Sequence, residues 1–191
     1  MRRGTLTRNT RETNITVEVN LDGTGKHDLQ VTPPFFSHML ATLSTHSLVD
    51  ITMSASGDLK HHIIEDTALV LGQAMNKALG QREDIARFGF AFVPMECSLA
   101  RAAIDLAERP YAAVDLGFKG ERIEETATED LVHFIRSFAS CMKIDLHVNI
   151  EYGENDHHRA EAAFKAIALA IRQAIAERGA KQLPQSTKGG L

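Results

Sequence analysis

The sequence contains the pattern His-His-x-x-Glu twice, at residues 61–65 and again at residues 157–161. After each copy, apolar residues recur at every third or fourth position, which is typical of the buried face of an amphipathic helix. They are Ile64, Ala68, Leu71, Met75 and Leu79 after the first copy, and Ala160, Phe164, Ile167, Ile171 and Ile175 after the second. Each copy therefore predicts the beginning of a helix that carries metal-competent side chains.

Helical geometry divides each motif between two faces. His61 and Glu65 are four residues apart and project from one face of the predicted helix. His62 points about 100° away, because a helix turns once per ~3.6 residues. The same division applies to the second motif. Each helix can thus give one histidine and one glutamate to one metal ion, while its other histidine reaches toward a second ion.

The motifs belong to a longer internal duplication. When the two motifs are aligned, His38 matches His133 and Asp50 matches Asp145. The pattern of predicted elements around them is strands, helix, strand, helix in both halves. Helices segregated against a mostly antiparallel sheet predict an α+β fold. We expect residues 1–84 to form the first half, and residues 85–191 to form the second half with a C-terminal tail, in one compact unit.

Alternating apolar residues, turn signals and helical spacing predict the individual elements. The expected strands are 14–21, a short one ending at 31, 49–55, 87–93, 98–106, 111–116 and 143–152. The expected helices are 35–45, 61–80, 129–141 and 157–178.

Composition limits the class of protein. The 191 residues are 43% hydrophobic, enough for a sizeable core. A net charge of −4 without a basic block argues against a nucleic-acid partner. No apolar stretch approaches the length of a membrane span, and the start lacks a signal peptide, so we expect no membrane partner. Two cysteines, Cys97 and Cys141, favour a reduced, cytoplasmic protein over a disulfide scaffold.

The duplicated positions supply six imidazoles and two carboxylates, enough for two metal sites. They are His38, His61, His62, Glu65, His133, His157, His158 and Glu161. Nitrogen and oxygen donors without thiolate suit Mn(II), Fe(II), Co(II) or Zn(II), and ligand type alone does not choose among them. Helix geometry pairs His61 with Glu65, and we expect His38 to join them. We likewise expect His133 to join His157 and Glu161, while His62 and His158 cross over to the other helix's site.

Two further residues lie on metal-facing surfaces of the predicted helices. Lys165 is four residues after Glu161, where the first half has Leu69, so the duplication departs there toward a cation. A cation beside metal ligands suits an anionic substrate, although a solvated helix lysine explains the spacing equally well. His46 lies two turns beyond His38 and is a candidate to approach the substrate.

Several motifs together resemble imidazoleglycerol-phosphate dehydratase, a family of histidine biosynthesis. They are both His-His-x-x-Glu copies, Phe35-Phe36-Ser37-His38-Met39-Leu40, Arg87-Phe88-Gly89, Pro94-Met95, Arg109-Pro110-Tyr111, His133-Phe134, Ser137-Phe138-Ala139 and Ser186-Thr187-Lys188-Gly189. The chain departs from the family pattern in a shortened segment, Asp58-Leu59-Lys60, and at Pro33, Ser37 and Glu96-Cys97-Ser98. None of these departures removes a ligand.

The resemblance implies a duplicated α+β fold like the second domain of ribosomal protein S5. It implies two manganese ions per active site, bound by the eight residues above, and a lyase that dehydrates imidazole glycerol phosphate to imidazole acetol phosphate. The family assembles as a large homo-oligomeric shell of twenty-four subunits, with active sites shared between subunits. The residues that match its substrate-binding set are Glu12, His38, His46, Arg87, Arg109, Lys165, Ser186 and Lys188.

In the implied reaction a hydroxyl leaves from the carbon attached to the imidazole, and a proton leaves from the neighbouring carbon. Glu12 and Glu161 are both candidates to accept that proton. Two other functions remain open from the residues alone. One is a dinuclear metallohydrolase, and the other is a non-catalytic protein that stores or senses metal.

Overall fold

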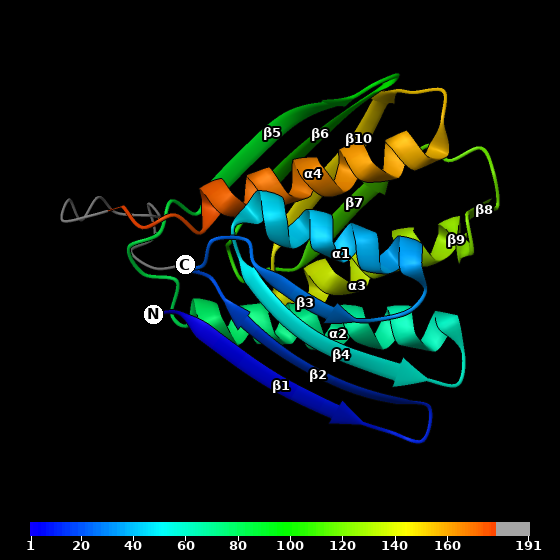
Figure 1. Ribbon diagram of the computed structural model, residues 1–191. Helices are drawn as coiled ribbons and strands as arrows, with labels where there is room; N and C mark the ends of the chain where they lie inside the picture. The colour runs from blue at the N-terminus through cyan, green and yellow to red at the C-terminus, as the bar shows by residue number, and fades with distance from the viewer. Residues whose placement is uncertain (179–191) are drawn as a thin grey trace.

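The computed structural model describes residues 1–178. Within them the chain alternates short groups of strands with single helices, in an order that is nearly the same in its two halves (Figure 1). The strands are β1 (Arg3–Asn9), β2 (Thr13–Asn20), β3 (His27–Gln30), β4 (Asp50–Gly57), β5 (Phe88–Met95), β6 (Ser98–Asp105), β7 (Tyr111–Asp115), β8 (Arg122–Ile123), β9 (Thr126–Ala127) and β10 (Asp145–Tyr152). The helices are α1 (Pro34–Ser47), α2 (Lys60–Leu79), α3 (Thr128–Met142) and α4 (Asp156–Ala174).

Two four-stranded sheets have the same topology. The first has the order β1-β2-β4-β3 and the second the order β5-β6-β10-β7. In each sheet the first three strands are antiparallel, and the last one runs parallel to its neighbour. That parallel pair is joined by a crossover helix, α1 in the first sheet and α3 in the second. The expected α+β fold with an internal duplication is confirmed. No element spans the expected division after residue 84, although that boundary stays a prediction.

The helices lie between the two sheets, so the described chain has four layers (Figure 1). Helix α2 packs on β1 and β2, and α4 packs on β5 and β6. The two helix layers also pack against each other, with α2 against α3 and α1 against α4. Each of these helix pairs joins one helix of the first half to one helix of the second half.

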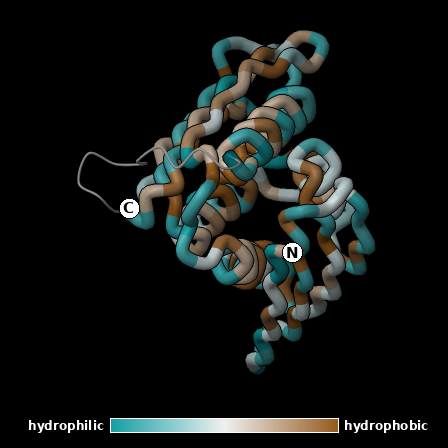
Figure 2. The backbone as a smooth tube through the Cα atoms, turned by 90° about the vertical axis from the view of Figure 1, so that its left-hand side faces the viewer, coloured by the Kyte–Doolittle hydropathy of each residue, from teal (hydrophilic) through white to brown (hydrophobic). Residues whose placement is uncertain are grey.

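The core fills the space between the helices and the inner faces of the sheets. Hydrophobic and hydrophilic residues alternate along the strands (Figure 2), and in β2 Ile15, Val17 and Val19 are completely buried. Phe134 and Phe164 stack with 5.8 Å between ring centroids, linking α3 to α4. Among residues 1–178, no helix combines the length and apolar character that a membrane span requires.

Three elements differ from the sequence expectations. Strand β1 was not predicted, because its exposed positions are polar and its buried Gly4 carries no apolar side chain. The β8–β9 hairpin is an insertion found only in the second half. Helix α4 ends at Ala174, four residues before the expected end, because the following chain turns to pair with the segment before β5. There Ile85 forms a bridge with Glu177.

A glycine at the same place in each half permits the close contact between helix and sheet. A Cβ at Gly4 in β1 would collide with the carbonyl oxygen of Ala74 in α2, and a Cβ at Gly89 in β5 would collide with that of Ala170 in α4. Both collisions are with backbone, which cannot move aside as a side chain can. The two helices therefore approach their sheets more closely than any other residue would allow.

We expect Gly89→Ala to lower the free energy of unfolding by about 1–3 kcal/mol, because overpacking forces a backbone shift. Gly4→Ala should act similarly. The control is Gly120→Ala, since a Cβ there would lie 3.4 Å from its nearest neighbour, an oxygen of Asp156. Urea unfolding of the metal-free protein measures all three variants. Equal midpoints for Gly89→Ala and Gly120→Ala would contradict the steric argument.

Arg2 links the beginning of the chain both to the turn after β2 and to the end of α4. Arg2 donates to Asp22 through Nε at 2.9 Å and through Nη2 at 2.6 Å, and its Nη1 donates to the carbonyl oxygen of Ile175 at 2.5 Å. The hydrogen bonds from Arg2 hold the pKa of Asp22 below its usual value. Because that pKa is lowered, the pair's contribution to stability is present above the unfolded-state pKa of ~3.9 and is lost as pH falls through the folded-state value.

We therefore expect Asp22→Asn to be less stable than the wild type near pH 6, by roughly 1 kcal/mol or less because the pair is partly exposed. The difference should shrink as pH falls below about 4. Urea midpoints of both metal-free proteins between pH 6 and pH 3 give the measurement. A difference that stays constant over this range would mean that the carboxylate charge does not contribute.

Candidate metal centres

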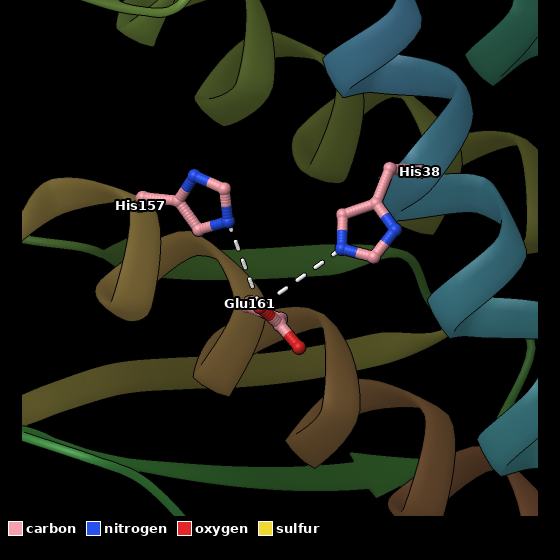
Figure 3. Close-up of side chains that lie close together, drawn as sticks. All are labelled: His38, His157 and Glu161. Carbon is pink, nitrogen blue, oxygen red and sulfur yellow. Dashed lines mark ion pairs between the residues drawn. The ribbon is translucent and has the colours of Figure 1, made fainter.

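One cluster of possible metal ligands joins α1 to α4. The Nε2 atom of His38 lies 3.9 Å from Oε2 of Glu161, and Nε2 of His157 lies 3.7 Å from the same oxygen. These side chains point toward one another across the helix pair (Figure 3), and their ligand atoms all lie within 4.8 Å of each other. Glu161 is mostly buried, with 13% of its side chain exposed, whereas His38 is half exposed. The group is thus open to solvent on one side.

A second, similar group joins α2 to α3. The Nε2 atom of His133 lies 3.3 Å from Oε1 of Glu65, and Nε2 of His61 lies 3.7 Å from Oε2 of the same residue. The rings of His61 and His133 are 5.9 Å apart. This group repeats the first one with the roles of the two halves exchanged.

The expected assignment of the third histidine was wrong. His38 does not join His61 and Glu65, and His133 does not join His157 and Glu161; each lies beside the other half's motif. The cause is the helix packing, because α1 lies against α4 and α3 lies against α2. Spacing along one helix correctly pairs His61 with Glu65, but it contains no information on which helix lies opposite.

The second histidine of each motif points away from these groups, as helical geometry predicts. The Nδ1 atom of His62 lies 2.8 Å from Oδ1 of Asp58, and Nδ1 of His158 lies 3.3 Å from Sγ of Cys97. The hydrogen bond with Asp58 raises the pKa of His62. The hydrogen bond with His158, with help from nearby backbone N–H groups, lowers the pKa of the Cys97 thiol to about 6. The expected crossing of these two histidines to another site stays a prediction.

Lys165 lies at the first cluster. Its Nζ contacts Oε1 of Glu161 at 2.7 Å and Sδ of Met95 at 3.3 Å. Burial raises the pKa of Glu161, but the hydrogen bond and charge of Lys165, with His38 and His157, bring the net pKa below its usual value. Burial, together with the charge of Lys165, lowers the pKa of the half-buried His46. Lys165 and His46, which the helix spacing placed near the candidate ligands, are therefore both close to this cluster.

The donor set fits a divalent cation. Each cluster offers two imidazole nitrogens and one glutamate, and all four imidazoles face the carboxylate through Nε2. In the first cluster both imidazoles approach the same oxygen of Glu161, whereas in the second they approach different oxygens of Glu65. An ion between such atoms would have three protein ligands and open positions. Manganese, iron, cobalt and zinc all accept these donors.

Glu12 lies in the turn between β1 and β2, outside both clusters. Its backbone carbonyl accepts a hydrogen bond from Asp58 N at 3.0 Å, which fixes this turn beside the beginning of α2. Its exposed carboxylate is close enough to His62 to contribute to the raised pKa of that residue. Glu12 and Asp58 therefore both border His62.

The other residues that match the family's substrate-binding set lie elsewhere. Arg87 hydrogen-bonds Asp105 through Nε at 2.6 Å and through Nη2 at 2.9 Å, and its backbone N–H donates to Ala174 at the end of α4. About 25 Å of helix separates Ala174 from His157, at ~1.5 Å per residue. The exposed Arg109 precedes β7 at the same end of the second sheet. Ser186 and Lys188 lie outside the described residues.

Asp130 supports the second cluster, although it was not among the predicted site residues. Its Oδ1 lies 2.6 Å from Nδ1 of His61, and its side chain is only 9% exposed. A signal was available, because Asp130 is three residues before His133 and so shares its helix face. A carboxylate on Nδ1 orients the ring and directs Nε2 outward.

Comparison with known proteins gives a family. The family model for imidazoleglycerol-phosphate dehydratase matches residues 32–171. The chain belongs to this family. The dehydratase of Chloroherpeton thalassium is 45% identical over 177 residues, covering 91% of both chains, and that of Dehalococcoides mccartyi is 45% identical over 191 residues, covering 100% of this chain and 97% of the relative. The chain is therefore an enzyme, a hydro-lyase of histidine biosynthesis.

Two solved structures of the family support the fold. The dehydratase of Staphylococcus aureus superimposes with a TM-score of 0.85 at 26% identity, covering 92% of this chain and 99% of that one. The dehydratase of Pyrococcus furiosus gives a TM-score of 0.84 at 34% identity, covering 97% and 100%. The duplicated architecture is thus shared with the family over nearly the whole chain.

Proposed function

We propose that the chain catalyses the metal-dependent dehydration of imidazole glycerol phosphate to imidazole acetol phosphate. The observation that carries the proposal is the pair of two-histidine, one-glutamate clusters in a member of this family. Manganese is the proposed cofactor, two ions per active site. A divalent cation at such a cluster would supply Lewis-acid stabilisation of negative charge on the substrate's imidazole.

The chain's own residues divide the remaining tasks. Glu161 is already engaged by Lys165 and by two imidazoles, so we assign it to ligation and positioning. The exposed Glu12 has its carboxylate near His62 and outside both clusters, and we assign it to accept the proton from the carbon next to the leaving hydroxyl. Lys165 brings a positive charge to the first cluster, where it favours an anionic substrate.

The activity is tested by stripping the full chain with a chelator and adding back one metal at a time. Imidazole glycerol phosphate is the substrate, and formation of the ketone product is the measurement. We expect chelation to abolish turnover and Mn(II) to restore it. Full turnover in protein shown to be metal-free would exclude the metal-dependent mechanism. Hydrolysis of phosphate esters without dehydration would favour a metallohydrolase instead.

The pairing of ligands across the halves leads to a separate prediction. Residues of one cluster should be coupled, so His38→Ala and Glu161→Gln together should weaken Mn(II) binding by less than the sum of their separate effects. His38→Ala combined with Glu65→Gln should be close to additive, because those residues belong to different clusters. Free Mn(II), measured by electron paramagnetic resonance during titration, gives the affinities. The opposite pattern of coupling would contradict the pairing.

A large homo-oligomer with shared active sites is part of the proposal. Arg87 and Arg109 lie at the opposite end of α4 from His157, so one subunit cannot bring them to its own first cluster. A neighbouring copy could supply them. The second sheet also exposes aromatic side chains, which is typical of an interaction surface. They are Phe88, Phe90, Phe92, Tyr111 and Tyr152.

We expect metal to favour this assembly, because binding energy available only in the assembled state stabilises it. Chelated protein should sediment as a smaller species, and Mn(II) should return it to a large one. Analytical ultracentrifugation of the same sample before and after metal addition makes the measurement. Chelated protein that keeps its full size while losing activity would contradict the shared-site arrangement but leave the dehydratase assignment intact.

A cytoplasmic location is also proposed. Cys97 and Cys141 are both free thiols in the described structure, which suits a reducing compartment.

A further inference from the structure

Hydrogen-bond acceptors lie behind several of the imidazoles at the helix beginnings. Nδ1 of His61 faces Asp130 at 2.6 Å and Nδ1 of His62 faces Asp58 at 2.8 Å, so both acceptors in the first motif are carboxylates. An imidazole that donates from Nδ1 has its lone pair on Nε2 and is held in one orientation. His61 and His62 are therefore both oriented so that Nε2 is the atom available to a metal ion.

In the second motif, the acceptor that faces Nδ1 of one histidine is a sulfur atom. Nδ1 of His158 faces Sγ of Cys97 at 3.3 Å, within hydrogen-bond distance for sulfur. Cys97 lies in the turn between β5 and β6, and this turn reaches the beginning of α4. The backbone N–H of His158 is in turn held by Oδ1 of Asn155 at 3.2 Å. Both the backbone and the ring of His158 are thus fixed from outside its own helix.

We propose that Cys97 is a positioning residue for His158: its sulfur accepts the Nδ1–H and leaves the Nε2 lone pair available as a ligand for a divalent cation, on the side of the ring where the exposed carboxylate of Glu96 lies 3.6 Å away. This inference rests on the proposed metal-dependent function. It requires an acceptor at position 97 and no direct contact between sulfur and metal. Asp58 performs the same task for His62, so the two halves use different chemistry at equivalent histidines.

Matched variants distinguish two roles of the Cys97 side chain, which are accepting a hydrogen bond and filling space. Cys97→Ala removes the acceptor, whereas Cys97→Asn replaces it with an amide oxygen and adds no charge. Cys141→Ala is the control, because Cys141 is the chain's other free thiol and lies on α3. Binding of Mn(II) to the full chain is followed by electron paramagnetic resonance of the free ion, and urea midpoints of the metal-free proteins report any general loss of stability.

We expect Cys97→Ala to weaken one class of Mn(II) sites by about 10–100-fold, as loss of a histidine's outer hydrogen-bond partner typically does. The other class of sites in Cys97→Ala should keep its wild-type affinity for Mn(II). Both classes should keep it in Cys97→Asn and in Cys141→Ala. Unchanged binding in Cys97→Ala would overturn the proposal. Equal losses in Cys97→Ala and Cys97→Asn would also overturn it, because the sulfur itself would then be required. A wild-type chain that binds no Mn(II) would instead overturn the proposed function.

Discussion

The contact between the two helix layers is the constraint on which the site depends. Each His-His-x-x-Glu motif has its glutamate and one histidine on a single helix, but the third ligand comes from a helix of the other half. The edge-to-face contact of Phe36 in α1 with Phe134 in α3, 5.0 Å between ring centroids, links the two layers, and both side chains are buried. A shift between the layers would separate His38 from Glu161 without altering either helix. Packing deep in the core therefore determines the distances between the candidate metal ligands.

The sequence predicts those features that depend on short-range periodicity. The helices, the alternating strands, the pairing of His61 with Glu65 and the duplication itself all follow from spacing along the chain. What it could not predict was which helix lies opposite which, since that depends on packing between layers. Strand β1 was not predicted because its buried position is a glycine, Gly4, which has no hydrophobic side chain. Asp130 was not predicted as a site residue because a single carboxylate near a histidine is common on helix surfaces.

The two halves share a fold, but the residues around their two clusters differ. Lys165 gives the first cluster a cation where α2 has Leu69, and burial with that charge lowers the pKa of His46. The β8–β9 hairpin is present only in the second half, and its neighbouring Glu125 accepts a hydrogen bond from the backbone of Phe35 at 2.9 Å. These differences surround the cluster on α4. The two candidate metal centres of the duplicated fold thus have unequal surroundings.

The exchange of ligands between halves also bears on how such a chain could arise. One unit alone, with four strands and two helices, contains every ligand type but cannot fold its own third histidine onto its own motif. Two identical units packed about a twofold axis would each complete the other's cluster. If the clusters hold metal, a half-length chain of this kind would bind it only as a dimer, and joining two copies in one chain keeps the pairing while allowing each half to diverge.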